Sequence, residues 1–263
     1  MDALLYLASG ALAGLLAGLF GIGGGLVLVP VLAWLFARQG LGGDHLMHLA
    51  VGTSLATIVV TSLASLRAHH RRGAVDTGVL GRLLPGIVLG GLGGAWLADR
   101  LPTDGLRQFF GVFELLVALQ MLLAARYRPH RDLPGAAGLF LAGSLIGGVS
   151  ALLGIGGGTL SVPFLIWCSV PLVRAVGTSA AAGLPIALSG AAGFWLAGLD
   201  APDLPPWSSG YIHWPAWLGI SLASMLTAPL GAALAHRLDT RLLKRGFALV
   251  LALVGARMLG LWQ

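Results

Sequence analysis

Charged side chains are scarce in this sequence: only 10% of its 263 residues are Asp, Glu, Lys or Arg. Soluble domains carry about 25% charged residues. Hydrophobic residues make up 57% of the chain, and its mean hydropathy is +0.88. A protein of this composition lacks the polar residues needed to cover a water-facing surface. The shortage of charge therefore excludes an ordinary soluble domain and predicts an all-α protein that crosses a membrane several times.

Cysteine is nearly absent as well. The single Cys168 excludes an intramolecular disulfide and argues against a thiolate metal site. No pair of histidines has metal-site spacing, and no G-x-x-x-x-G-K-[ST] segment occurs, so we expect neither a metal, nor a cofactor, nor direct drive by ATP. The net charge of +6 comes from short basic clusters between apolar runs. Because no basic stripe is present, nucleic acid is not an expected partner.

Long apolar runs are abundant. Six of them reach the roughly 20 residues that a membrane-spanning helix needs. Four shorter runs form two pairs, 3–20 with 25–37 and 135–153 with 158–170, and each pair predicts either two tight spans or one re-entrant hairpin. The six long runs are 46–66, 79–98, 106–125, 175–197, 215–235 and 242–262.

A glycine-rich segment, GIGGG, joins the members of each short pair. A glycine inside a helix costs about 1 kcal/mol relative to alanine, and the proline that follows each segment removes a backbone donor. Both segments therefore predict a deliberate helix break. The residues Gly21, Gly23, Gly24, Gly25 and Pro30 recur 133 positions later (154 − 21 = 133) as Gly154, Gly156, Gly157, Gly158 and Pro163.

The repetition extends beyond the breaks, because Gly52-Thr53-Ser54 recurs as Gly177-Thr178-Ser179. We therefore divide the chain into a first membrane repeat at 1–125, a basic linker at 126–134 and a second membrane repeat at 135–263. Each repeat contains about five helical elements.

Arginine and lysine orient the two repeats. The connection 67–82 holds four arginines, whereas its counterpart 198–214 holds no lysine or arginine. The connection 236–245 and the linker 126–134 are also basic. Basic connections stay on the cytoplasmic side, so 67–82, 126–134 and 236–245 are predicted to be cytoplasmic. This arrangement places the repeats in opposite orientations in a multi-pass protein of the cell (inner) membrane.

An inverted repeat gives the breaks a chemical role. In inverted-repeat transporters, broken helices meet near the bilayer midplane, and their N-terminal ends point at the substrate. The helices that start near Gly25 and Gly158 would present free N–H groups and the positive end of the helix dipole. Such a site suits a small anion that is bound without chemical change.

Two GIGGG segments, each followed by a proline and then by a Gly-Thr-Ser helix start, resemble the TauE/SafE family of bacterial anion exporters. This family is also called the toluene-sulfonate uptake permease family. The resemblance implies a secondary transporter, an exporter of sulfite, sulfonates, sulfoacetate or related anions by alternating access. It also implies a substrate site made of Gly21, Gly23, Gly24, Gly25, Pro30, Thr53, Ser54, Gly154, Gly156, Gly157, Gly158, Pro163, Thr178 and Ser179.

The two breaks differ in hydroxyl content. The first copy has Leu26 and Leu28 where the second has Thr159 and Ser161. We therefore add Thr159 and Ser161 to the predicted substrate site and expect the second repeat to supply more hydrogen-bond donors.

Ionisable residues within membrane segments are costly and usually functional. Glu114 is the only acid well inside an apolar run, and Arg257 is the only base. Glu114 is a candidate for proton coupling and Arg257 for attracting the anion; alternatively, Glu114 is partly hydrated and Arg257 reaches the membrane interface. The expected partners are thus a small anion, the lipid bilayer and, as coupling ion, the proton.

Two other functions remain open at this level. An anion-selective channel would share the polar lining of a carrier. An intramembrane hydrolase would use Ser189 as nucleophile and His213 or His236 as base, although the sequence favours a protein that is not an enzyme. His213 also stands beside Trp207, Trp214 and Trp217, and this cluster predicts an aromatic belt at the membrane interface.

Overall fold

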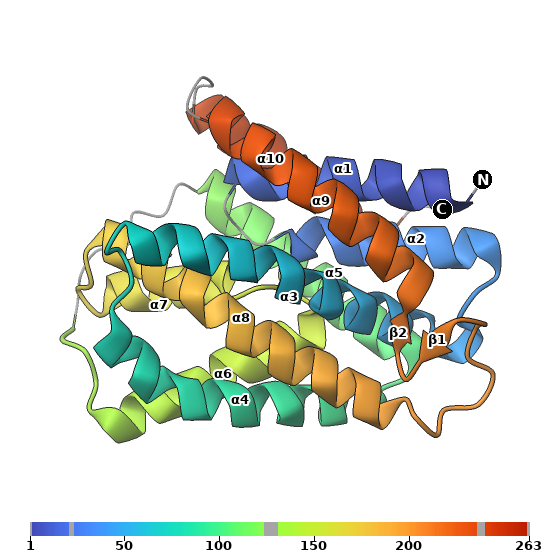
Figure 1. Cartoon of the computed structure of the whole chain (residues 1–263), viewed down its shortest axis with the longest axis horizontal. Coiled ribbons are helices and arrows are strands. Elements are labelled where there is room, and N and C mark those ends of the chain that lie inside the picture. The colour runs from blue at the N-terminus through green and yellow to red at the C-terminus, as the bar shows by residue number, and fades with distance from the viewer. Residues whose placement is uncertain (1, 21–23, 124–130, 236–239, 262–263) are drawn as a thin grey trace.

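The structure, a computed structural model, describes residues 2–20, 24–123, 131–235 and 240–261. Nearly all of this described chain is helical, which confirms the predicted all-α polytopic fold (Figure 1). A 3₁₀ turn, η1 (Gly43–His45), precedes the third helix, and a two-stranded hairpin, β1 (Ser208–Ser209) and β2 (Ile212–His213), precedes the ninth. The α-helices are α1 (Asp2–Phe20), α2 (Gly25–Gln39), α3 (Leu46–Arg71), α4 (Thr77–Asp99), α5 (Thr103–Leu122), α6 (Ala136–Leu153), α7 (Gly158–Trp167), α8 (Leu172–Ala197), α9 (Trp214–Ala235) and α10 (Thr240–Met258).

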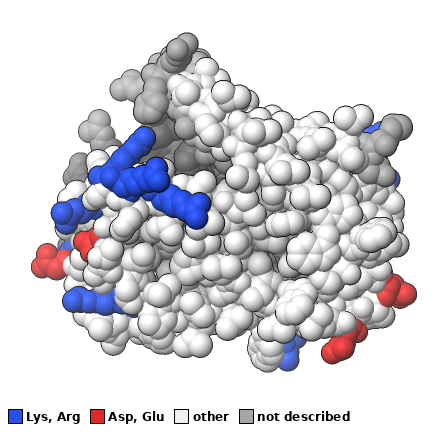
Figure 2. Space-filling model, viewed as in Figure 1, with Lys and Arg blue, Asp and Glu red and all other residues white. Residues whose placement is uncertain are grey.

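The surface is that of a membrane protein. Among the described residues, α3, α4, α5, α6 and α8 are long and apolar enough to cross a bilayer. Many large apolar side chains, such as Leu145 and Leu226, are exposed. Figure 2 shows charged side chains towards the ends of the molecule and an uncharged region between them. An exposed apolar region of this extent is suited to contact with lipid rather than water.

Two parallel helix pairs join the first half of the chain to the second. In the α4–α6 pair, Cβ atoms added to Gly86 and Gly94 would collide with the backbone of Phe140 and Gly148, so the glycines allow the helices to touch. In the α1–α9 pair, Gly10 and the Ile220 backbone make the same kind of contact. Exchange of the two predicted repeats would interchange these two pairs. The packing is compatible with two repeats, which stay a prediction.

The centre of the molecule is an antiparallel pair, α3 and α8. Every residue of α3 from Met47 to Ile58 is buried. Gly190 of α8 contacts Leu55 of α3, and Gly183 contacts Ser62, so residue numbers rise along one helix as they fall along the other. α5 and α10 form a further pair. The second helix break lies beside the buried part of α3, at Val51.

Candidate functional site

The two helix breaks meet. Gly25 starts α2, and a Cβ atom added to it would lie 2.6 Å from Ile155 Cα and closer still to the Gly154 carbonyl oxygen. Gly24 and Gly154 have left-handed backbones, with φ of 75° and 64°, which only glycine adopts without strain. Gly154 ends α6 in this conformation, so the chain turns sharply where it meets the first break. Gly21 and Gly23 lie outside the described residues.

The central helix α3 fixes the second break. The Ser54 hydroxyl donates to the Gly154 carbonyl over 2.9 Å. The Val51 backbone and the Val29 side chain also close around Gly154, at 3.2 and 2.7 Å from an added Cβ. Ser54 is one of the predicted site residues. It lies at the break, where it binds the backbone.

The start of α7 packs against α8. A Cβ added to Gly157 would lie 3.1 Å from the Ser179 carbonyl oxygen, 3.3 Å from Ser161 Oγ and 3.0 Å from Ile186 Cδ1. The first backbone N–H groups of a helix have no partner within the helix. Gly183 of α8 faces this segment, since a Cβ added there would lie 3.8 Å from the Gly157 nitrogen, at ordinary van der Waals distance. Gly156 and Gly158 flank it in the same segment.

Four buried hydroxyl groups near this break have no hydrogen-bond partner among the described residues. A buried polar group left unpaired costs about 1–3 kcal/mol. Ser161 and Ser179 are both only 1% exposed, whereas the first break has the buried apolar side chains Leu26 and Leu28 at the positions that match Thr159 and Ser161. All four free donors therefore lie in the second half of the chain, on α6, α7 and α8. They belong to Ser150, Thr159, Ser161 and Ser179.

The prolines after the breaks lie inside helices. Pro30 falls in the second turn of α2 and Pro163 in the second turn of α7. A proline supplies no N–H to the carbonyl four residues earlier. The carbonyls of Leu26 and Thr159 consequently receive no intrahelical bond from these positions.

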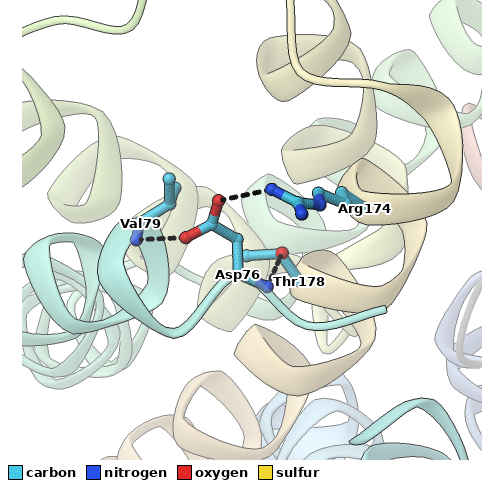
Figure 3. Close-up of polar contacts among 4 residues, drawn as sticks. All are labelled: Asp76, Val79, Arg174 and Thr178. Carbon is cyan, nitrogen blue, oxygen red and sulfur yellow. Dashed lines mark hydrogen bonds and ion pairs between the residues drawn. The ribbon is translucent and has the colours of Figure 1, made fainter. Parts of the chain in front are cut away.

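Two predicted site residues bind the chain itself. Thr53 Oγ1 accepts a hydrogen bond from the His213 backbone N–H over 3.0 Å. Thr178 Oγ1 accepts one from the Asp76 backbone N–H over 2.9 Å (Figure 3). The sequence predicted substrate contacts for both hydroxyls, with helix capping or a bond to neighbouring backbone as the alternative, and it did not indicate which backbone groups they bind.

The two intramembrane ionisable residues differ in burial. Glu114 is fully buried, and its two carboxyl oxygens have no partner among the described residues. Gly255 of α10 lies against it, since a Cβ added there would be 3.1 Å from Glu114 Cβ. Arg257 is exposed on the same helix, α10. The structure therefore does not bring Arg257 and Glu114 into an ion pair.

His213 is not part of the aromatic belt. It is 5% exposed, whereas Trp207 is 80% exposed. The imidazole packs against Tyr6 and Phe36, with ring centroids 6.0 and 5.4 Å away. Its Nδ1 accepts a hydrogen bond from the Ala216 N–H over 3.3 Å. The prediction missed this burial because the hairpin folds His213 inward, whereas Trp207 and Trp214 stay exposed. Trp217 is half-buried and donates its indole N–H to the Ala56 carbonyl.

The proposed hydrolase residues do not meet. Ser189 donates its hydroxyl to the Pro185 carbonyl of its own helix over 2.8 Å. His213 serves the start of α9 instead, and His236 lies outside the described residues. No group of three His, Cys, Asp or Glu side chains that could hold a metal ion occurs within the described ranges.

Comparison with known proteins agrees with this architecture. Residues 6–258 match the family model described as sulfite exporter TauE/SafE. A probable membrane transporter protein of Haemophilus influenzae is 38% identical, and the match covers 97% of each chain. The probable membrane transporter protein YunE of Bacillus subtilis is 27% identical over 98% of each chain. No solved structure matches this chain.

These names describe transporters rather than enzymes. A model match across nearly the whole chain, together with the buried double break and the lipid-facing surface, establishes the class of the protein. The chain belongs to the TauE/SafE family, and it is a multi-pass membrane transporter.

Proposed function

We propose that this transporter moves small oxyanions, such as sulfite, sulfonates or sulfoacetate, and that it exports them across the cell (inner) membrane. The observation that carries the proposal is the group of four unpartnered hydroxyls around the N-terminal end of α7. An oxyanion would accept hydrogen bonds from these hydroxyls and from the backbone N–H groups at Gly157 and Gly158.

The site suits an anion for electrostatic reasons. The N-terminal end of a helix carries a partial positive charge, which stabilises an anion by about 0.3–1 kcal/mol at an exposed position and up to about 2 kcal/mol when partly buried. The glycines keep side chains away from the backbone, so an oxygen atom can reach the N–H groups. Gly25 and Ser54 from the first half complete the contact between the breaks.

Transport follows from the proposed inverted repeat. The two halves would rock about α3 and α8, so that the breaks open first to one side and then to the other. In the proposed topology, the basic connections 67–82, 126–134 and 236–245 face the cytoplasm, and the hairpin of β1 and β2 faces outward. Glu114 is the proposed proton-coupling group, because it is a buried carboxyl group without a partner among the described residues.

Flux into proteoliposomes tests this function. Purified protein should carry sulfite, sulfonates or sulfoacetate with saturation and counter-exchange, and should carry chloride poorly. Uptake that rises linearly with concentration, without counter-exchange, would favour the anion-selective channel. Equal flux of every anion would contradict the proposal of a site selective for oxyanions.

Matched serine variants test the location. Ser161→Ala and Ser179→Ala each remove one donor to a charged group, worth about 1.5–3 kcal/mol, so KM for the anion should rise about 10- to 150-fold. Ser144→Ala is the control, because the Ser144 hydroxyl is exposed and binds the carbonyl of Phe140 on its own helix. Unchanged KM in both site variants would place the substrate elsewhere.

A further inference from the structure

Two loops dock on the central helices through the Gly-Thr pairs. The hairpin before α9 places the Tyr211 carbonyl against Gly52, where a Cβ would collide with it, and the His213 N–H on Thr53. The loop before α4 repeats this arrangement at the other end of the central pair. There the Ala74 backbone lies against Gly177, and the Asp76 N–H binds Thr178.

Each docked residue also starts the next helix. Asp76 Oδ1 accepts a hydrogen bond from the Val79 N–H over 3.0 Å, at the first turn of α4. His213 Nδ1 accepts one from the Ala216 N–H over 3.3 Å, at the first turn of α9. Asp76 and His213 thus each join a loop, a central helix and the helix that follows the loop. A movement of α4 would therefore strain the hydrogen bond to Thr178, and a movement of α9 would strain the bond to Thr53.

The same pair of hydrogen bonds occurs in both halves of the chain. Asp76 and Val79 correspond to His213 and Ala216, each 137 positions apart (213 − 76 = 137; 216 − 79 = 137). Thr53 corresponds to Thr178, 125 positions apart. Because α3 and α8 are antiparallel, the two docked loops lie towards opposite ends of the central pair. In sequence, Ser54 and Ser179 directly follow the two threonines.

We infer that Thr53 and Thr178 are the latches of two gates, one formed by the hairpin at 208–213 and the other by the loop at 72–76. Both latches are closed in this structure. Release of one would free its loop and open a path to the helix breaks from that side only. The two threonines are therefore positioning residues rather than substrate ligands. This inference rests on the proposed transport function, because a gate has meaning only for a moving substrate.

The hydrogen bond to Thr178, rather than the neighbouring ion pair, holds the gate formed by the loop at 72–76. Asp76 also approaches Arg174 at 3.9 Å, but the Arg174 side chain is 63% exposed (Figure 3). Exposed ion pairs contribute little to stability. Thr178 is fully buried, and so is Thr53. Loss of either hydroxyl leaves a backbone N–H without its acceptor.

The experiment measures access from each side. Ala50 and Ala175 each lie three residues before a latch threonine, correspond to one another in the repeat, and are fully buried. Each is replaced by cysteine in full-length protein that carries Cys168→Ser, and labelled with a membrane-impermeant thiol reagent from either side. Thr53→Val should raise labelling of Ala50→Cys from the hairpin side about tenfold, the change expected from losing about one hydrogen bond. Thr178→Val should do the same for Ala175→Cys from the opposite side.

Two further variants make the result specific. Thr53→Ser and Thr178→Ser keep the acceptor and should restore slow labelling. Thr57→Val is the matched control, since the Thr57 hydroxyl binds only the Thr53 carbonyl of its own helix. Where a valine variant does not fold, Thr53→Ala or Thr178→Ala removes the same acceptor with less bulk.

The outcomes separate the gate from the substrate proposal. Labelling that rises on one side, with KM for the anion unchanged, supports the latches. Unchanged labelling with KM raised tenfold or more overturns them and makes the threonines ligands. Labelling that rises equally for both reporters indicates general loosening and also overturns them. If no oxyanion is carried but labelling responds on one side as expected, the latches stand and the substrate proposal fails.

Discussion

Gly25→Ala is the sharpest perturbation of the contact between the two breaks. The added methyl group would lie 2.6 Å from Ile155 Cα, whereas ordinary van der Waals contact begins at 3.4 Å. The obstacle is backbone, which has no rotamer that moves it aside. The start of α2 and the end of α6 would have to separate by at least about 0.8 Å (3.4 − 2.6 = 0.8), and by more at the nearer Gly154 carbonyl oxygen, a distance that matters because interiors are packed at close to crystal density.

The magnitude follows from overpacking. An inserted methyl group in a packed core costs about 1–3 kcal/mol. The same separation would disturb the Ser54 hydrogen bond to the Gly154 carbonyl, because that oxygen lies even nearer to the added methyl than Ile155 Cα does. If the closed contact is part of the transport cycle, flux should fall about 5- to 150-fold, the factor equivalent to that energy.

Flux in proteoliposomes and thermal unfolding in detergent measure the effect together. Gly93→Ala is the control, because no atom lies within 4 Å of a Cβ at this position of α4. Gly25→Ala should lose most of its flux while the protein still inserts in the membrane. Gly93→Ala should keep its flux and should keep or raise the melting temperature, because alanine favours the helix interior. Wild-type flux and an unchanged melting temperature in Gly25→Ala would refute the contact as drawn.

Three further predictions concern coupling, topology and the hairpin. Glu114→Gln should flatten the dependence of flux on pH, measured across a series of buffers, and an unaltered profile would remove Glu114 from coupling. Cysteines placed at Arg71 and at Ser208 should react with impermeant thiol reagents from opposite faces, and reaction from one face would contradict the inverted topology. Tyr211 donates to Asp99 over 2.8 Å, and burial and this bond raise the pKa of Tyr211, so it remains a donor at neutral pH. Tyr211→Phe should therefore lower the free energy of unfolding by about 1 kcal/mol in a denaturant titration, and no loss would show that the bond contributes nothing.

The bounds of the helices could be predicted to within a few residues, because a membrane-spanning helix appears in the sequence as an uninterrupted apolar run. The predicted run 25–37 became α2 (Gly25–Gln39), and the run 135–153 became α6 (Ala136–Leu153). Four glycines within five residues have no role in a helix interior, so the break before α7 was also visible. Both signals are local, and each depends on residues close together in the chain.

The docking of the loops could not be predicted, because it depends on contacts across more than a hundred residues. The Asp76 segment, AVDTG, and the His213 segment, YIHWP, share no residue at matching positions. Their common feature is a backbone N–H on a threonine and a side-chain acceptor at the start of a helix. Aspartate and histidine both supply that acceptor, so the two segments share a hydrogen-bonding geometry without sharing a sequence.

The unequal breaks suggest how the two halves divide the task. Backbone glycines of both halves form the contact at Gly25 and Gly154, whereas the unpartnered hydroxyls near it lie on α6, α7 and α8. An anion held mainly by the second half would move with that half when the breaks separate. Substitutions at Ser161 or Ser179 would then change affinity, and substitutions at Gly25 would change the rate of the conformational step. A transporter with equal halves would show both effects from either side, so measuring KM and maximal flux separately for the two kinds of variant distinguishes the two designs.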